Sequence, residues 1–452
     1  MSQKKLSSLF LLIMLIVSAI DSIRNLPSTA LFGNDIIFFC ILGAVTFLVP
    51  IAWLSSHLSQ SYPESGGIYE WLKMAFSPAI AILGIWLQWV NTVIWYPTIL
   101  SFIAGTLAYA INPTLIHHQS FFIGTMVISF WLLTLINLFG IQSSALFASI
   151  CTAIGVFLPL FIIIICAIFW ALTHHHTQIH LNPTHWIPQH LEDTHWTSLT
   201  AIIASYLGIE LATVHSHSIQ NANKLFPPAL FISVVIIVST MISGSFSIAM
   251  VIPTKDLSLV QGVMQAFTYF FKQFHMNYLS PFMAGCLIVG SLGGMINWII
   301  SPSEGLVQAS IDGHLPQFIA RKNRFGAAYW MLISQAIIVS IIGFSFVFIK
   351  SINQFYWLLT DLSTELYLMM YVLFIGSAFV LLRKKEKRMK MTAIALIGII
   401  GCIIALVVGF FPPKLLYGIN PVHYSLIFSS SLILMMTPGL IIAYYGFKTR
   451  VK

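Results

Sequence analysis

Hydrophobic residues run along this chain in long segments that are nearly unbroken. Neither the alternation of a half-buried strand nor the stripe of a soluble helix is present over most of its length. A hydrocarbon core about 30 Å thick needs roughly 20 apolar residues per helix. The pattern predicts an all-α membrane protein with twelve transmembrane helices, over approximately residues 7–31, 37–58, 79–110, 119–140, 145–172, 197–217, 227–251, 278–310, 327–349, 355–382, 392–411 and 422–446.

The composition agrees with a chain that is membrane domain along almost its whole length. Hydrophobic residues make up 58% of the 452 residues and charged residues only 8%. The longest loops, 173–196 and 252–278, are too short to build a core of their own. We therefore expect a single transmembrane domain over residues 1–452, and neither a receptor ectodomain nor a tethered enzyme.

Basic residues predict the orientation of the chain. If the N-terminus is cytoplasmic, sixteen Lys and Arg fall on the cytoplasmic side and four on the other, while Arg24 lies in the membrane. This asymmetry places both termini in the cytoplasm of a bacterial cell, with the protein in the inner membrane. The formal net charge of +8 comes from Lys and Arg in short loops, which form no basic face for nucleic acid. We therefore expect anionic lipid as the partner and no nucleic acid.

Two predicted spans contain interruptions that a simple membrane anchor does not need. The first holds Asp21 and Arg24 close to Pro27, and the sixth holds Gly208 beside Glu210. Charged groups at this depth are costly unless they face protein, water or a ligand. In many transporters, paired broken helices bind the charged groups of a substrate near the middle of the membrane. Half-helix ends suit a carboxylate and an ammonium group, which together describe an amino acid.

Each interruption also has a simpler interpretation. Asp21 and Arg24 can neutralise each other as an ion pair, and a glycine such as Gly208 can simply let two helices pack closely.

Seven stretches of the sequence resemble the amino acid, polyamine and organocation (APC) transporter superfamily, in its glutamate:GABA antiporter branch. They occur in the family's order between about residues 10 and 380. The stretches are SIRNLPSTALFG, YPESGGIYEWL, WLQWVNTVIWYPTILSFIAGTLAYAINP, YLGIELATVHSHSIQNANKLFPPAL, PTKDLSLVQGVMQAF, GSLGGMINWIISPSEGL and YWLLTDLSTELYLMMYVL.

The resemblance implies a five-plus-five inverted repeat with broken helices 1 and 6. The repeats would cover about residues 7–172 and 197–382, and two additional helices would cover about 392–446. Substrate would lie between the broken helices, against parts of spans 3, 8 and 10. Carried over to this chain, the substrate-binding residues are Asp21, Ser22, Ile23, Arg24, Tyr96, Ser205, Tyr206, Gly208 and Met295.

Four acidic residues are candidates for proton coupling or gating: Glu210, Glu304, Asp361 and Glu365. Asp361 and Glu365 are four residues apart, so they share one helix face and could relay protons. The alternative for Asp361 is a position near a helix end, in contact with water. For Glu304 we expect an aqueous cavity at a helix break over residues 301–304.

The acidic residues also bear on the choice of substrate. Asp21 and Ser22 stand where many superfamily members have a glycine-rich break, and Glu304 and Glu365 are further departures from the antiporter branch. Extra acids near the pathway favour a less acidic, even cationic, substrate.

The predicted outer loop is rich in histidine, at His174, His175, His176, His180, His185, His190 and His195. The spacing fits no familiar metal site, so we expect a solvated loop without bound metal. Protonation below about pH 6.5 would make this face positive, which keeps pH sensing as a second hypothesis.

These observations predict a secondary active transporter, either an antiporter or a proton-coupled permease, that moves amino acids or their amine derivatives by alternating access. A permease for cationic amino acids or polyamines is the alternative, followed by a transceptor that senses its substrate. No Walker loop, HExxH pair, nucleophile elbow or dinucleotide fingerprint is present. We therefore expect no enzymatic activity and no cofactor. The expected partners are small-molecule substrates, lipid and protons, and no oligomeric state follows from the sequence.

Overall fold

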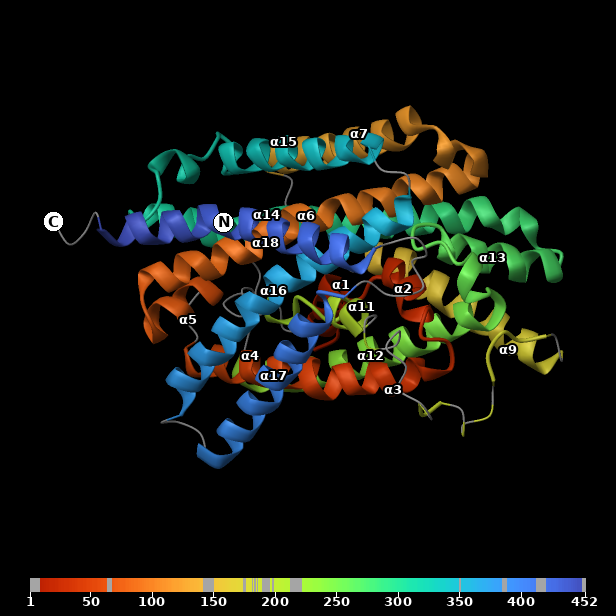
Figure 1. Ribbon diagram of the computed structural model, residues 1–452, viewed down its shortest axis with the longest axis horizontal. Coiled ribbons are helices and arrows are strands. Elements are labelled where there is room, and N and C mark those ends of the chain that lie inside the picture. Colours follow the sequence, from red (N-terminus) through yellow and green to blue (C-terminus); the bar gives the residue numbers. More distant parts are fainter. Residues whose placement is uncertain are drawn as a thin grey trace.

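The computed structural model describes residues 9–62, 67–140, 150–173, 176–180, 182, 184, 186–188, 196, 199–211, 222–348, 351–383, 388–411 and 420–448. The regular elements in these ranges are all helical, and many of the long helices run roughly along the longest axis of the molecule while others run obliquely to it (Figure 1). This agrees with the all-α part of the predicted fold class.

Ten helical segments in the described ranges are long and apolar enough to cross a membrane, and they coincide with ten of the twelve predicted spans. Two of them bend through a π-helical turn, η3 (Ala44–Leu48) in one and η5 (Ala153–Phe157) in the other. The helices that build these segments are α3 (Ile36–Gly43) with α4 (Val49–Ser61), α6 (Pro78–Ile111), α7 (Gln119–Leu138), α9 (Leu158–Leu172), α12 (Ala222–Val251), α14 (Ser280–Ile311), α15 (Tyr329–Ser345), α16 (Ile352–Leu382), α17 (Arg388–Val408) and α18 (Pro421–Lys448).

The other two predicted spans are the interrupted ones. The first consists of α1 (Leu9–Ile20), a non-helical pair of residues, a single 3₁₀ turn η1 (Ile23–Asn25) and the short helix α2 (Leu26–Ala30). In the sixth, α11 (Leu199–Ala204) stops after six residues and gives way to a turn. Both interruptions predicted from the sequence are therefore present.

Helix α6 lies at the centre of the bundle and contacts α14, α16 and α18. Helix α12 packs against both parts of the first broken span, α1 and α2. On the outer helices, large apolar side chains such as Ile397, Leu426 and Leu434 are exposed. This exposure is typical of helices that face hydrocarbon, where an apolar surface needs no cover.

Two short helices lie outside the long segments, α5 (Ile68–Ala75) and α13 (Gly262–Gln273). Helix α5 is fastened to the end of α14, because Lys73 Nζ lies 2.5 Å from Asp312 Oδ2 and the Tyr69 hydroxyl donates to the same oxygen at 3.1 Å. Burial alone would raise the pKa of Asp312, but the hydrogen bonds from Lys73 and Tyr69 outweigh it and lower that pKa. Acid therefore weakens this contact only at a pH below the ordinary range of an aspartate.

The predicted break at residues 301–304 is wrong, because α14 continues through Pro302. Proline has no N–H to give to the carbonyl one turn earlier, which is that of Trp298. The Tyr96 hydroxyl donates to this carbonyl instead, at 2.7 Å, and the Gln335 amide donates to the carbonyl of Ile299 at 3.4 Å. The neighbouring helix α6 thus satisfies the carbonyl that Pro302 frees, as membrane helices require. Glu304 lies on the exposed surface of this unbroken helix.

This arrangement predicts that Tyr96 and Pro302 are energetically coupled. Tyr96→Phe should lower the free energy of unfolding by about 1–3 kcal/mol, because it leaves a buried carbonyl unpaired. In a Pro302→Ala background the helix regains its own N–H, so the same substitution should cost about 1 kcal/mol less. Unfolding of the detergent-solubilised protein measures both values, with Tyr109→Phe on the same helix as the control. An equal cost in the two backgrounds would contradict this role.

Candidate functional site: a cavity between two helix breaks

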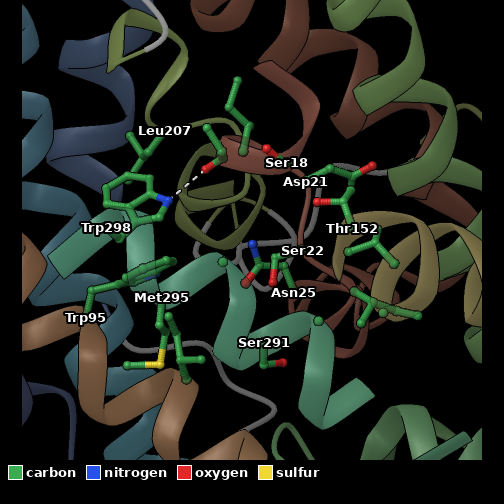
Figure 2. Close-up of a pocket in the computed structure, with 18 of the residues that line it drawn as sticks. Ser18, Asp21, Ser22, Asn25, Trp95, Thr152, Leu207, Ser291, Met295 and Trp298 are labelled. Atoms are coloured by element: carbon green, nitrogen blue, oxygen red, sulfur yellow. Dashed lines mark hydrogen bonds between the residues drawn. The ribbon is translucent and has the colours of Figure 1, made fainter. Parts of the chain in front are cut away.

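A cavity lies where the two interrupted helices meet α6, α14 and η5 (Figure 2). The space that the centre of a water molecule can occupy in it is about 50 Å³, so the cavity has room for only a few waters. The lining residues are Ser18, Ala19, Ile20, Asp21, Ser22, Ile23, Asn25, Asn91, Trp95, Ile99, Thr152, Gly155, Val156, Ala204, Leu207, Gly290, Ser291, Gly294, Met295, Trp298 and Tyr367.

The first break places a carboxylate on the cavity wall. The N–H of Asp21 closes the last turn of α1 on the carbonyl of Val17 at 2.8 Å, and Ser22 is extended, with φ −139° and ψ 116°. The Asp21 carboxylate is buried, and its Oδ2 accepts a hydrogen bond from the Thr240 hydroxyl of α12 at 2.7 Å. Within the described part of the chain no other hydrogen bond reaches this carboxylate. Oδ1 is therefore available to a ligand.

The second break depends on a glycine. Gly208 has φ +100°, a conformation that L side chains rarely adopt, and a Cβ at this position would lie 2.9 Å from the ring of Trp298. Its backbone N–H donates to the Tyr371 hydroxyl at 2.9 Å. Only glycine satisfies both the backbone conformation and the close approach of the indole.

Trp298 of α14 connects the two breaks. Its indole Nε1 donates to the carbonyl of Ala19 at 2.9 Å, which the end of α1 leaves without a helical partner (Figure 2). The same ring packs over Gly208 and lies against Trp95 of α6, with 4.8 Å between the ring centroids. One side chain thus closes the wall of the cavity and holds both interrupted helices.

Arg24 lies beside the cavity as a buried cation without an acidic partner. Its guanidinium donates to the hydroxyls of Thr98 at 3.0 Å and Tyr356 at 3.4 Å, and it stacks 4.4 Å above the ring of Trp95. Nε has no hydrogen-bond partner, and no acidic residue in the described ranges forms an ion pair with this side chain. Asp21 and Arg24 therefore do not neutralise each other, and the ion-pair alternative is wrong. The buried positive charge favours an anion nearby.

Another part of the cavity wall is formed where η5 and α14 cross closely. A Cβ on Gly155 would collide with the backbone of Gly290, and a Cβ on Gly290 would collide with Gly155 in turn. Small residues at such a crossing let two membrane helices approach closely. The crossing brings Thr152 to the cavity lining, on the same side as Asp21 (Figure 2).

Glu210 lies behind the second break as the acceptor of a buried network. The hydroxyl of Tyr367 donates to it at 2.5 Å, the Gln88 amide at 3.3 Å, and the Tyr371 hydroxyl donates to its other oxygen. Tyr367 and Tyr371 belong to α16 and Gln88 to α6, so one carboxylate joins the end of the sixth span to both of these helices.

Comparison with known proteins agrees with this architecture. Residues 8–437 match the amino acid permease family. The chain belongs to this family. An uncharacterized transporter of Legionella pneumophila is 35% identical to it, with 91% of the permease and 90% of the relative covered. The glutamate/gamma-aminobutyrate antiporter of Lactococcus lactis is 29% identical (91% and 85% covered), and the probable agmatine/putrescine antiporter of the same species is 25% identical (84% and 80%). The resemblance to the APC superfamily and its antiporter branch is confirmed, and the permease is a transporter, not an enzyme.

The predicted substrate-binding residues of the permease divide into two groups. Asp21, Ser22, Ile23 and Met295 line the cavity. The others lie behind it and hold its wall: besides Arg24, Tyr96 and Gly208, these are Ser205, whose hydroxyl donates to the carbonyl of Ala201 at 2.8 Å, and Tyr206, whose hydroxyl donates to the carbonyl of Cys40 at 3.1 Å.

The predicted proton-coupling residues of the permease all lie outside the cavity lining. Asp361 is fully buried well inside α16, so the alternative of a position near a helix end in contact with water is wrong. The hydroxyls of Thr200 and Tyr424, each on a neighbouring helix, donate hydrogen bonds to its carboxylate. Glu365 is buried one turn further along α16.

Most other residues of the permease's cavity region were not predicted from the sequence, and the three with the clearest structural roles are Trp95, Thr240 and Trp298. Trp298 had a usable signal, because it follows Met295 by three residues and so shares its helix face. Trp95 directly precedes the predicted Tyr96 in a matching stretch, and it is Trp95 that lines the cavity. Thr240 is one of several hydroxyl residues in the mainly apolar helix α12, and nothing in the sequence distinguishes it from the neighbouring serines.

The described part of the permease contains no group of three His, Cys, Asp or Glu residues arranged to hold a metal ion. His174, His175, His185, His190 and His195 lie outside the described residues. The hypotheses on the histidine-rich loop therefore stay predictions.

The Glu210 network predicts a large difference between two substitutions. Glu210→Ala leaves the buried hydroxyls of Tyr367 and Tyr371 without this acceptor, at about 1–3 kcal/mol each, so the solubilised permease should melt at a clearly lower temperature. Glu210→Gln keeps one acceptor, and tyrosine hydroxyls can turn to accept from its amide, so it should melt closer to wild type. Thermal unfolding measures both, with Glu304→Ala on the exposed surface as the control. Equal melting temperatures for Glu210→Ala and wild type would remove this structural role.

Proposed function

We propose that this permease is a secondary active transporter of amino acids or their amine derivatives, working by alternating access around the cavity between the two breaks. We further propose twelve transmembrane helices, with inverted repeats over about 7–172 and 197–382 and two additional helices over about 392–446. The positions of the interruptions support this proposal, because they fall five spans apart.

The observation that carries the proposal is the placement of opposite charges at one break. The Asp21 carboxylate lines the cavity with one oxygen lacking a described hydrogen bond, which suits an ammonium group. Arg24 is a buried cation without an acidic partner beside the same wall, and Ser22 and Asn25 supply polar atoms next to it. A zwitterion would place its ammonium group at Asp21 and its carboxylate on the side of Arg24, which lies behind the cavity lining, whereas an apolar solute carries neither charge.

The size of the cavity supports a mechanism in which the helices move. The cavity holds only a few waters and is too small for an amino acid. Binding must therefore widen the space between the breaks. The short helices α1, α2 and α11 can shift as separate units because neither interrupted span is one continuous helix.

The alternative is a permease for cationic amino acids or polyamines. Asp21 favours it, and so does the similarity to a probable agmatine/putrescine antiporter. Such a substrate would leave Arg24 without an anion, and for that reason we place it second. For the cellular context we propose the bacterial inner membrane, with both termini in the cytoplasm.

Counterflow in proteoliposomes with a panel of amino acids and their decarboxylated amines tests this function directly. Wild type should exchange at least one zwitterionic amino acid. Asp21→Asn keeps a hydrogen-bonding group but removes the charge, so KM should rise roughly tenfold to a hundredfold, the worth of one charge-assisted hydrogen bond. Asp21→Ala should abolish saturable exchange.

The control is Asp256→Asn, which removes an acid from an exposed turn far along the chain. Exchange at the wild-type KM in Asp21→Ala would make this carboxylate structural and overturn the proposed site.

A further inference from the structure

A second pair of acidic residues is buried at the junction of α11, α16, α17 and α18. Asp361 and Glu365 are four residues apart on α16, so they lie one turn apart on the same helix face. Both are 0% exposed, and neither lines the cavity between the helix breaks. They form a separate polar site inside the membrane domain.

The two carboxyl groups have very different surroundings. Asp361 accepts hydrogen bonds from the Thr200 hydroxyl of α11 at 2.7 Å and from the Tyr424 hydroxyl of α18 at 2.5 Å. Neither oxygen of Glu365 has a hydrogen-bond partner. Its carboxyl group packs against Gly409, just after α17, in the space that a Cβ there would occupy. The glycine thus leaves space for the Glu365 carboxyl group, but no hydrogen-bond donor in the ranges that the structure describes reaches it.

The charges around the pair need a compensating cation. Among the described residues, the titratable groups that face Glu365 are Asp361 on its own helix and Tyr424 on α18, while α11 contributes the uncharged Thr200 and the end of α17 contributes Gly409. No Lys, Arg or His forms an ion pair with either acid in this part of the chain. Two adjacent anions in a low-dielectric interior repel each other strongly, and one of them has no donor at all. A single proton on Glu365 removes that cost.

We propose that Asp361 and Glu365 together form a proton-binding site, distinct from the substrate cavity, whose occupancy is coupled to the position of α11. A metal ion fits less well, because it needs several converging oxygen ligands and Glu365 has no other polar atom within hydrogen-bonding distance.

The coupling follows from the two ends of α11, and this step rests on the proposed function. At one end Thr200 donates to Asp361, and at the other Ala204 lines the substrate cavity. If substrate shifts α11 and withdraws Thr200, Asp361 loses a donor that stabilises its charged form, and the pair binds a proton more tightly. By linkage, the proton then favours the shifted position of α11 to the same degree.

Infrared difference spectroscopy of the purified, full-length protein in liposomes tests the site without any substrate. A protonated carboxyl group has a carbonyl stretch that a carboxylate lacks. Wild type should show such a band at neutral pH, and Glu365→Gln should remove the equivalent of one carboxyl group from it. Asp256→Asn, in an exposed turn, should leave the band unchanged.

A second variant covers the case in which Glu365→Gln does not fold. Tyr424→Phe removes one donor to Asp361 without touching Glu365, so the band should persist to higher pH than in wild type. An unchanged band in folded Glu365→Gln, or an unchanged pH midpoint in Tyr424→Phe, would overturn the shared proton site. A band that appears only when sodium is withdrawn would overturn it as well, in favour of a sodium site.

Transport supplies the coupled readout. An inward proton gradient should accelerate uptake by wild type and should have no effect on Glu365→Gln. If a proton gradient still accelerates uptake by Glu365→Gln, the proposed coupling between this proton site and transport is wrong. Failure of wild type to exchange any amino acid would instead refute the proposed function, and the infrared result would still decide the proton site.

Discussion

The structure depends on one constraint of the membrane interior: a backbone group released from a helix must find a partner within the protein. Three aromatic side chains supply these partners. The Trp298 indole donates to the Ala19 carbonyl at the end of α1, the Tyr371 hydroxyl accepts from the N–H of Gly208, and the Tyr96 hydroxyl donates to the carbonyl that Pro302 leaves free. Each interrupted or proline-containing helix is thereby held by a neighbour.

This constraint also defines the cavity. With these backbone groups paired, the Asp21 carboxylate is the charged group that the breaks present to the cavity. Met295 and Trp298 come from the same face of α14, so one helix supplies both a lining side chain and the clamp that joins the two breaks. A ligand that moves Trp298 would therefore act on α1 and the end of α11 together.

Local features of the sequence predicted the helices and both breaks correctly, because long apolar runs, a buried Asp and a helical Gly act within a few residues of themselves. Partner choice is a tertiary property, and there the sequence failed. Pro302 was expected to break its helix, but a tyrosine two hundred positions earlier in the chain supplies the missing donor. Asp21 and Arg24 were candidates for an ion pair, yet they bind Thr240 and Thr98 on different helices.

The claim that substrate binds between the two breaks is tested most directly by a cysteine at Ser22, which lines the cavity. The five native cysteines are buried, so the new thiol should dominate labelling by a small membrane-permeant reagent. A transported amino acid should slow this reaction with the same half-saturation as counterflow, and it should not slow labelling of a cysteine at the exposed Ser120. Labelling of Ser22→Cys at an unchanged rate in saturating substrate would contradict a site between the breaks.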